Sequence, residues 1–543
     1  MMTDRPLLTE VCATTAPGAH EPDGSALAMP RVHKFGGTSV DGAERLQALA
    51  AIIRDQADCS VVVVSAMAGV SDELSRLVDA ATAGQDSRAA SDPSATLAAM
   101  KQRHLDVLQG IVREDGARAP VAERIEEIFD AATQLVGEGP GGEAGRFGDQ
   151  LMAVGEDLAV ELTVAALRAE GIPAAVLNAR DIVWTNSEFG AAVPDFESVR
   201  RLAPSNILPL VEDGIVPVIQ GFIGSEAGGA TTTLGRGGSD FTATLLAAAL
   251  GSPEVVIWTD VDGILSGDPN LVGDSRVVPN VGSEEVVELS YFGARVIHPA
   301  AAKHAIVSGL PLRIKNSFAP ERPGTLVHPD RGVAAAFAAV AHKTDVALIR
   351  VRAFPTALAY GFLARVFGVL GRHRVPVDLV STSHSSTAFT VERDEDLSAV
   401  RRALSVFSEV DVLRDVATVT VVGRGLLREP GMDALVFWAV EKTPVYLISQ
   451  ASDVSISFVV DEAEAPELVR RLHLSLIELR GEAEEHEALE VEAREDEAGE
   501  MEAAAEETEG GAGEMEAAAE GAAEETEEGA EEQGSRRRKG EGR

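Results

Sequence analysis

Cysteine is nearly absent from this chain of 543 residues, which contains only two. Cys12 and Cys59 are too few for a disulfide framework or for a metal site built from thiolates. No apolar run reaches the roughly 20 residues that are needed to span a bilayer. The first 29 residues carry carboxylates but no continuous apolar segment, which argues against a signal peptide. We therefore expect a cytoplasmic protein without a membrane anchor.

Lysine is also scarce, with 7 residues against 40 arginines, and the formal net charge is −40. The stretch 481–543 holds 24 acidic and 6 basic residues and contributes −18, so the remaining residues contribute −22. A negative field of this size repels nucleic acid, so we expect the body of the protein to have no nucleic-acid partner. The acidic, lysine-poor composition resembles that of proteins from salt-rich cytoplasm, although a GC-rich genome also favours arginine over lysine.

The two ends of the chain lack the periodicity of helices or strands. Residues 1–29 are polar and contain proline and glycine, and Met29 directly precedes the first ordered segment, which makes it a candidate start. Near the other end, Gly-Glu-Met-Glu-Ala-Ala-Ala-Glu at 499–506 recurs at 513–520. We expect both ends to be disordered, because neither offers apolar residues for a core. A basic RNA or targeting signal at 536–539 is an alternative for the last residues.

Short apolar strands alternate with helical segments between residues 30 and 330. The chain is long enough for about three domains, and this alternation predicts an α/β fold with a mostly parallel central sheet flanked by helices. Sites in such sheets lie at the carboxyl ends of the strands. We predict strands at 32–35, 61–64, 173–177, 215–223 and 255–258, and helices at 41–56, over most of 72–140, and at 154–170.

A glycine-rich stretch, Thr231-Thr-Thr-Leu-Gly-Arg-Gly-Gly-Ser-Asp240, lies between a predicted strand and a predicted helix. Glycine lets the backbone approach a ligand, and the following helix points its positive end at the same place. Arg236 adds a planar fork that fits a carboxylate or a phosphate. Asp240 could cap the helix or hold a cationic group. The alternative is a structural turn capped by Ser239 and Asp240, because glycine-rich loops are common.

A second glycine turn follows the first predicted strand. Lys34 precedes Gly36 and Gly37, and the hydroxyls of Thr38 and Ser39 come after them. This order is the reverse of a Walker A loop, whose lysine follows the last glycine, but it supplies the same backbone donors, positive charge and hydroxyls to a phosphate. A purely structural turn from strand to helix is the alternative.

Several motifs, in this order over about 300 residues, together resemble aspartate kinase. They are Lys34-Phe-Gly-Gly-Thr-Ser39, Asn186 to Asp195, Gly235-Arg-Gly-Gly-Ser-Asp240, Trp258-Thr-Asp-Val-Asp-Gly263, Phe292-Gly-Ala-Arg-Val-Ile-His-Pro299 and Ile314-Lys-Asn-Ser317. The resemblance implies the amino-acid-kinase fold, which is unrelated to that of P-loop NTPases and protein kinases.

The resemblance also implies a reaction, the ATP-dependent phosphorylation of the side-chain carboxylate of L-aspartate to 4-phospho-L-aspartate on the way to lysine, threonine and methionine. Phosphoryl transfer needs alignment and charge neutralisation, and Mg2+ is expected on the phosphates of ATP. Lys34 and Asp240 are the implied catalytic residues. The implied aspartate pocket comprises Ser71, Glu156, Arg236, Gly237, Gly238 and Ser239. The implied nucleotide site comprises Lys34, Gly36, Gly37, Thr38, Ser39, Thr259, Asp260, Leu265, Asn270 and Arg295.

Three of these nucleotide-site positions depart from the family pattern. Leu265 and Asn270 replace a usual tyrosine and arginine, and Arg295 replaces a usual lysine. By position alone, Glu156 would be a solvated residue on its predicted helix. Two hypotheses follow: an active, feedback-controlled aspartate kinase, or a catalytically weak paralogue that senses amino acids as a regulatory subunit. The kinases of acetylglutamate and glutamate fit less well, because they lack the sensing modules that the sequence after residue 329 indicates.

After Pro329 the pattern changes to two similar sets of strands and helices. The first set has strands at 347–351, 377–380 and 387–391, and the second repeats it with strands at 445–449 and 454–460. The repeat resembles tandem ACT domains, the α+β (βαββαβ) amino-acid-sensing modules of aspartate kinases. The expected domains are 1–29 (disordered), 30–330 (kinase), 340–415 (first ACT), 416–478 (second ACT) and 481–543 (disordered).

Residues of the first module match the effector contacts of the family. These are Gly361, Phe362 and Leu363 at a helix start, and Asp378, Thr382 and Ser383 around a strand. The family builds this site between two chains, which implies a homodimer or homotetramer joined through ACT domains. The match is best with lysine-responsive members, so lysine is the expected effector and threonine the alternative, although Thr356 and His384 depart from the lysine pattern.

Overall fold

The computed structural model describes residues 29–56, 60–82, 92–293, 296–329, 339–354, 360–393, 397–427 and 432–478. Both predicted disordered ends therefore lie outside the described residues, apart from Met29. Contacts divide the chain into two units, residues 1–470 and 471–543, and every described strand belongs to the first. Within the described ranges, no helix is both long and apolar enough to cross a membrane.

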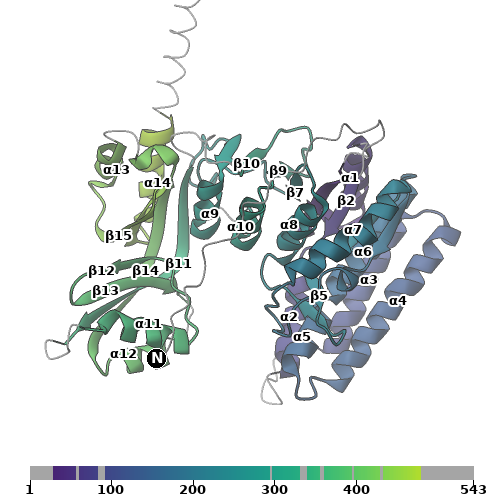
Figure 1. Cartoon of the computed structure of the whole chain (residues 1–543), viewed down its shortest axis with the longest axis horizontal. Helices are drawn as coiled ribbons and strands as arrows, with labels where there is room; N and C mark the ends of the chain where they lie inside the picture. Colours follow the sequence, from purple (N-terminus) through teal and green to yellow (C-terminus); the bar gives the residue numbers. More distant parts are fainter. Residues whose placement is uncertain are drawn as a thin grey trace, which may run out of the picture. The chain divides into compact units, whose positions relative to one another are not determined.

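An eight-stranded sheet forms the core of the region that was predicted to be α/β (Figure 1). Its strands are β1 (Arg31–Phe35), β2 (Ser60–Val64), β3 (Ala174–Leu177), β4 (Val216–Gln220), β7 (Val255–Thr259), β8 (Asn280–Gly282), β9 (Leu312–Asn316) and β10 (Thr325–His328). The order is β3-β4-β2-β1-β7-β9-β10-β8, and only the β9–β10 pair is antiparallel. The predicted mostly parallel sheet is confirmed.

Helices cover both faces of this sheet, because successive side chains of a strand point to opposite faces. In the fully buried β2, Val61 and Val63 join one apolar core, and Val62 and Val64 join the other. One core is covered by α7 (Phe196–Glu212), α8 (Gly238–Leu250), α9 (Ser283–Phe292) and α10 (Pro299–Val307). The other is covered by α1 (Ala43–Asp55), α2 (Val70–Thr82), α3 (Pro93–Ile111), α4 (Asp115–Glu138), α5 (Ala144–Met152) and α6 (Val154–Ala169).

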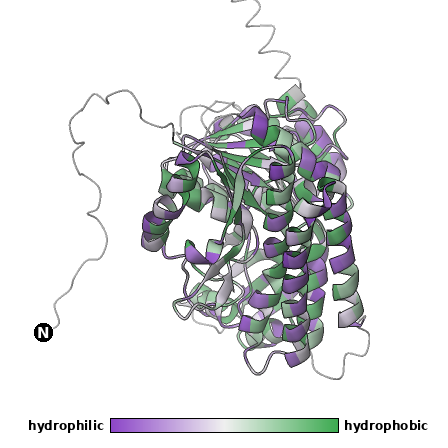
Figure 2. Ribbon diagram, turned by 90° about the vertical axis from the view of Figure 1, so that its right-hand side faces the viewer, coloured by the Kyte–Doolittle hydropathy of each residue, from purple (hydrophilic) through white to green (hydrophobic). Residues whose placement is uncertain are grey.

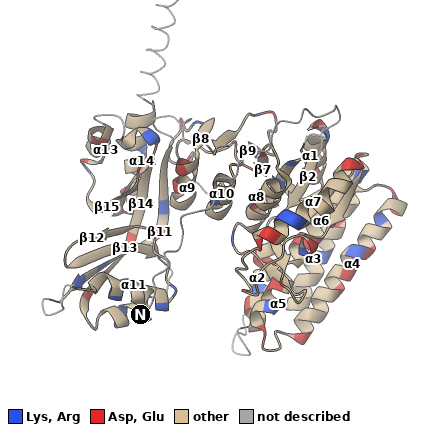
Figure 3. Cartoon of the chain, in the orientation of Figure 1, with Lys and Arg blue, Asp and Glu red and all other residues tan. Residues whose placement is uncertain are grey.

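The helices are amphipathic in the way that this layered packing requires. Hydrophobic residues line the strands and much of the long helices (Figure 2), and α3 and α4 also carry several acidic and basic residues (Figure 3). The 24-residue α4 buries only Ile125, Phe129 and Ala132. Helix α6 differs because it is buried along most of its length, Glu156 included. The expectation of a solvated Glu156 is therefore wrong.

Short elements complete the rim of the sheet at the carboxyl ends of its strands. A 3-10 turn, η1 (Gly37–Val40), follows β1, and another, η2 (Ala179–Asp181), follows β3. The predicted single strand 215–223 is interrupted at Gly221 and continues as a hairpin of β5 (Ile223–Ser225) and β6 (Thr231–Thr233). Gly221 is required there, because a Cβ would lie 2.5 Å from the Cβ of Ser239.

The region after residue 338 forms one antiparallel sheet of six strands. They are β11 (Ala339–Ala353), β12 (Val380–Thr382), β13 (Ser386–Glu392), β14 (Ser408–Val422), β15 (Val445–Ser452) and β16 (Ser455–Asp461), in the order β12-β13-β11-β14-β16-β15. The helices are α11 (Phe362–Arg372), α12 (Ser398–Leu404), α13 (Met432–Val440) and α14 (Ala465–His473), with short turns η3 (Arg424–Leu427) and η4 (Leu474–Glu478). The predicted strand 377–380 begins only at Val380.

Strands β11 and β14 each serve two βαββαβ modules. Residues 348–353 of β11 pair with 408–413 of β14, and after an irregularity, residues 339–343 pair with 418–422. The second pairing adds 339–343 next to β14, so that these residues form a fourth strand in line with β14, β16 and β15. The sequence put the boundary between modules at 415 and 416. We propose instead that the first module, about 346–413, is inserted in the chain between residues 339–343 and the remaining strands of the second module.

Candidate active site

Lys34 and Asp240 meet at the centre of the site. Lys34 is at the carboxyl end of β1, and Asp240 lies in the first turn of α8, so the two predicted glycine motifs are brought together. The Lys34 Nζ lies 2.7 Å from Asp240 Oδ1, and both side chains are only about one-tenth exposed (11% and 12%). The backbone N–H of His298 donates to Asp240 Oδ2 at 3.4 Å. The carboxylate thus fixes the lysine ammonium at the edge of the sheet.

The start of α8 has the conformation that the glycine loop was predicted to provide. Gly237 caps the helix with a φ of +69°, in the left-handed region that favours glycine. Gly238 packs so closely that a Cβ would lie 2.8 Å from the ring of Phe222. The start of α8 lines the same cavity as Lys34, and the N–H of Gly238 donates to the carbonyl of Gly235 at 3.1 Å. The positive end of the helix dipole lies at this edge of the cavity.

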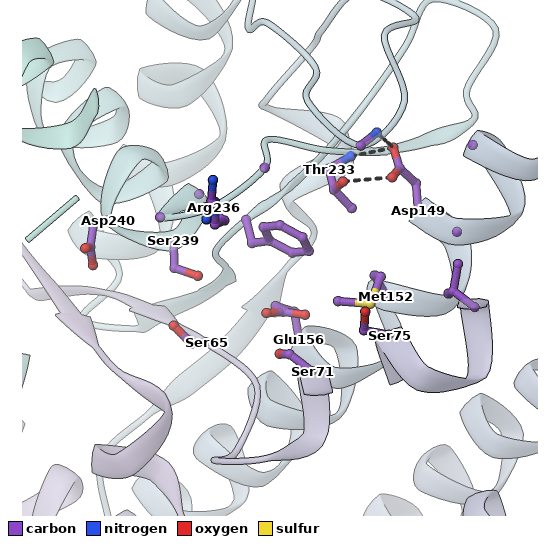
Figure 4. A pocket seen from close by; sticks show the side chains of 18 of the residues that line it. Ser65, Ser71, Ser75, Asp149, Met152, Glu156, Thr233, Arg236, Ser239 and Asp240 are labelled. Carbon is purple, nitrogen blue, oxygen red and sulfur yellow. Dashed lines mark hydrogen bonds between the residues drawn. The ribbon is translucent and has the colours of Figure 1, made fainter. Parts of the chain in front are cut away.

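A cavity of about 600 Å3 extends from Lys34 and Asp240 between α2, α5, α6 and the glycine loop. Figure 4 shows Glu156 and Ser71 on one side of this cavity and Arg236, Ser239 and Asp240 on the other. The predicted aspartate-pocket residues Ser71, Glu156, Arg236, Gly237, Gly238 and Ser239 all line it. The tertiary structure therefore gathers this whole set in one place.

Glu156 is the buried carboxyl of the cavity and is only 3% exposed. Its Oε1 accepts from the N–H of Ala66 at 3.3 Å, while Oε2 has no hydrogen-bond partner among the described residues. Burial raises the pKa of Glu156 to about 8, and the Ala66 N–H offsets only part of that effect. Gly155 lets α6 come this close, because a Cβ there would lie 2.7 Å from the Cβ of Ala66. An unpaired buried carboxyl of this kind can receive an ammonium group.

Arg236 supplies the opposite charge. Its side chain is exposed, lines the cavity and forms no hydrogen bond or ion pair with any residue that the structure describes. A guanidinium held on a rigid glycine loop is suited to a bidentate carboxylate contact. The cavity thus presents one acidic and one basic group to opposite ends of a small zwitterion.

Sequence reasoning missed other residues of the cavity, notably Asp149 of α5. Its Oδ2 accepts from the N–H of Gly190 at 3.0 Å and of Thr233 at 2.8 Å, and its Oδ1 accepts from the Thr233 hydroxyl at 2.7 Å (Figure 4). Burial raises the pKa of Asp149 and outweighs these donors, which lower it. No local pattern marks Asp149 as a site residue, because its partners come from distant segments. Ser65, Ser75, Met152 and Phe222 also line the cavity.

A second cavity, of about 290 Å3, lies beyond the carboxyl end of β7. Thr259, Asp260 and Leu265 line it, as the predicted nucleotide site requires. Asn270 does not line it but bonds to Asp268, through its N–H at 2.9 Å and its side-chain amide at 3.0 Å. Arg295, the remaining residue predicted beyond β7, lies outside the described residues.

In the turn after β1, some of the predicted nucleotide-site groups have partners within the protein. Ser39 is buried, and its hydroxyl lies 2.7 Å from that of Ser317, just after β9. The N–H of Gly36 donates to the carbonyl of Trp258 at 3.1 Å and is likewise occupied. Thr38 is exposed, and Gly37 must be glycine because a Cβ would lie 2.9 Å from the carbonyl oxygen of Ala66.

A third cavity, of about 860 Å3, borders both of the others. It shares Arg236 and Asp240 with the first cavity, and Asp268 and His342 with the second. Asp240, the partner of Lys34, therefore lines both the first cavity and the third, which also borders the cavity at the end of β7. This arrangement suits a transfer reaction between two bound molecules.

The predicted effector residues lie at two ends of the first module. Gly361 caps α11 with a φ of +78°, Phe362 packs on Phe407, and Leu363 is partly exposed. Thr382 and Ser383 lie at this same end, because Thr382 pairs with Thr387, which pairs with Val351 near the end of β11.

Asp378 lies at the other end, four residues before Thr382, which corresponds to about 13 Å of extended chain. It forms an ion pair with Lys343 at 2.7 Å and lines the third cavity. One chain therefore does not gather the six predicted effector residues into a single pocket.

Comparison with known proteins agrees with this geometry. The sequence pattern of the amino acid kinase family matches residues 29–316, and that of the ACT domain matches 419–476. The lysine-sensitive aspartokinase 3 of Escherichia coli is 33% identical over 82% of this chain and 99% of its own length. The aspartokinase of Candida albicans is 30% identical over 82% of this chain and 90% of its own length.

Two solved structures are also similar along most of the chain. Escherichia coli aspartokinase III in complex with aspartate and ADP, in the R state, superposes with a TM-score of 0.73 at 33% identity, over 82% of this chain and 99% of its own. The same enzyme with lysine and aspartate, in the T state, has a TM-score of 0.70 at 33% identity, over 83% of this chain and all of its own.

Fold and site together define an amino acid kinase, an enzyme that moves a phosphoryl group onto a small amino acid. Its C-terminal region carries the sensory fold of ACT domains. The chain belongs to the aspartokinase family, and it is an aspartate kinase with a regulatory ACT region.

Proposed function

We propose that this aspartate kinase joins L-aspartate and ATP across the ion pair of Lys34 and Asp240. The observation that carries the proposal is the Nζ–Oδ1 distance of 2.7 Å at the junction of the two cavities. Asp240 holds the ammonium of Lys34 where the transferring phosphoryl group would pass. The lysine then offsets the negative charge that spreads over the phosphoryl oxygens in the transition state.

Aspartate would bind in the first cavity through its two charged ends. The guanidinium of Arg236 receives the α-carboxylate, and the buried carboxylate of Glu156 receives the α-ammonium. The side-chain carboxylate is then directed toward Lys34 and the start of α8, where its oxygen attacks the terminal phosphorus of ATP. Alignment of this kind accounts for much of the catalysis that a phosphoryl-transfer enzyme provides.

ATP would occupy the second cavity, with its phosphates toward the third. Oxygen ligands are what Mg2+ prefers, and the carboxylates of Asp240 and Asp268 line the third cavity, so the residues present fit a cation that arrives with the nucleotide. When bound, Mg2+ would neutralise phosphate charge. In the part of the chain that the structure describes, no three His, Cys, Asp or Glu side chains form a metal-binding group, so phosphate and water would supply most ligands.

For regulation we propose feedback inhibition by lysine, with threonine as the alternative, at the predicted residues of the first module. The T-state relative was solved with lysine and aspartate. The 13 Å or so between Asp378 and Thr382 favours a site that two chains complete, and hence a homodimer or homotetramer. An effector can inhibit only if it binds two conformations with different affinity.

A hydroxylamine trap tests the reaction directly. Enzyme, ATP, Mg2+ and L-aspartate are incubated with hydroxylamine, and aspartyl hydroxamate and ADP are measured together. We expect stoichiometric hydroxamate and ADP that require both substrates, and none with glutamate or acetylglutamate. ADP without hydroxamate, or neither product, would favour the catalytically weak regulatory paralogue.

A further inference from the structure

Asp149 connects two segments that are distant from it in the chain but border the aspartate cavity. One is the loop around Gly190, and the other is β6, which runs directly into the glycine loop. The carboxylate uses both oxygens to accept three hydrogen bonds of 2.7 to 3.0 Å. It is 3% exposed, so each bond is made away from bulk water. A buried carboxylate with three donors is a rigid connection.

These two segments support each other next to Arg236. The N–H of Ala192 donates to the carbonyl of Thr233 at 2.8 Å. Gly235, with a φ of +76°, sits over the carbonyl of Gly190, where a Cβ would lie 3.3 Å from the oxygen. Arg236 follows Gly235 immediately and has no polar contact of its own in the described part of the chain. Its place therefore depends on the backbone on both sides: Gly237 and Gly238 pack closely after it, and Asp149 holds the backbone before it at Thr233.

We propose that Asp149 is a positioning residue for substrate binding. It fixes Thr233 and Gly190 against α5, so that the glycine loop presents Arg236 to the α-carboxylate of aspartate. Both of its oxygens are occupied by protein donors, which distinguishes it from Glu156, whose Oε2 is free to meet the substrate. The inference rests on the proposed role of Arg236.

The test compares Asp149→Ala with Asp149→Asn. An asparagine oxygen can accept from the two backbone N–H groups, and its amide can donate to the Thr233 hydroxyl, so all three bonds survive without the charge. We expect the aspartate KM to rise at least about 10-fold in Asp149→Ala and to stay within about 3-fold of wild type in Asp149→Asn, with the ATP KM within about 2-fold in both. Asp195→Ala is the matched control, because that exposed carboxylate caps α7 outside the cavity and should leave both constants unchanged.

A double-mutant cycle separates positioning from general destabilisation. In an Arg236→Ala background, Asp149→Ala should raise the aspartate KM by less than about 3-fold, because the group that it positions is gone. The same KM increase in both backgrounds, or a normal KM in Asp149→Ala, would overturn the inference. If Arg236→Ala itself leaves the aspartate KM unchanged, the proposed role of Arg236 is wrong and the inference fails with it.

A milder variant covers the case in which Asp149→Ala does not fold. Thr233→Val removes only the hydroxyl bond to Oδ1 and keeps the backbone bond to Oδ2. We expect a smaller rise in the aspartate KM, about 3-fold to 5-fold, again absent from the Arg236→Ala background. A Thr233→Val enzyme with wild-type constants would contradict the proposal.

Discussion

Gly237 and His298 meet so closely that a Cβ on Gly237 would lie 2.0 Å from Cγ of the histidine ring. His298 also caps α10, where its Nδ1 accepts from the N–H of Ala300 at 3.3 Å. The glycine loop and the start of α10 are therefore locked together beside Asp240, whose carboxylate accepts the His298 N–H.

This contact predicts that Gly237→Ala lowers kcat/KM by at least about 10-fold, because the loop or the histidine must move. Gly251→Ala is the control: Gly251 has a similar φ of +64° at the other end of α8, but nothing lies within 4 Å of its Cβ position. The control should lose some thermal stability, as Gly237→Ala should, yet keep its kinetics. Equal kinetics in the two variants would show that only backbone strain matters.

The central ion pair predicts a loss of turnover when either partner is removed. Lys34→Ala and Asp240→Ala should each lower kcat at least about 100-fold, because both act on charge that develops in the transition state. Steady-state rates with coupled ADP detection measure this effect. Near-normal turnover in Asp240→Ala would rule out the assignment.

Glu156 predicts a specific pH dependence. Its pKa of about 8 in the free enzyme means that it is mostly protonated at pH 7, whereas a bound ammonium favours the carboxylate. Aspartate binding should therefore release a proton, and the aspartate KM should fall as the pH rises from 6 to about 8 and then level off. Titration calorimetry in buffers of different ionisation enthalpy measures the released proton.

The corresponding variant tests whether Glu156 causes this dependence. Glu156→Gln should have a higher aspartate KM that no longer changes between pH 6 and 8. The raised pKa also implies that the free wild-type enzyme loses stability as the pH rises from the ordinary glutamate range through about 8, because the native state binds the proton more tightly than the unfolded state. A wild-type KM that is flat over this range would contradict the role of Glu156.

The pair of Lys343 and Asp378 predicts how the effector site responds to mutation. An effector ammonium must compete with the Lys343 Nζ, which lies 2.7 Å from Asp378. Asp378→Ala should abolish inhibition by lysine, whereas Lys343→Ala should lower the lysine concentration for half inhibition, because it removes the competitor. For each variant, the measurement is the ratio of the rate with lysine to the rate without lysine. An unchanged ratio for both variants, or a wild-type enzyme that ignores both lysine and threonine, would contradict the regulatory proposal.

Local pattern was enough for the elements that carry the chemistry. Lys34 lies at the end of an apolar strand, and the sequence already predicted that sites gather at the carboxyl ends of parallel strands. The glycine loop follows the short hairpin of β5 and β6 instead, which the sequence did not predict. The helix that holds Glu156 was predicted at 154–170, close to the observed bounds of α6. These features depend on neighbours in the chain.

Other features depend on which distant segments meet, and only the tertiary structure decided them. Glu156 is buried because Gly155 lets α6 pack against Ala66, and that burial raises its pKa. The buried hydroxyl of Ser39 meets that of Ser317, which comes from the end of β9. Asp149 becomes part of the site, and residues 339–343 join the second module, through pairings between distant segments. By itself, the sequence determined most of the strands, the motif loops and, through the family resemblance, the reaction class. Burial and long-range hydrogen bonding, which no local pattern encodes, decided what each side chain contacts.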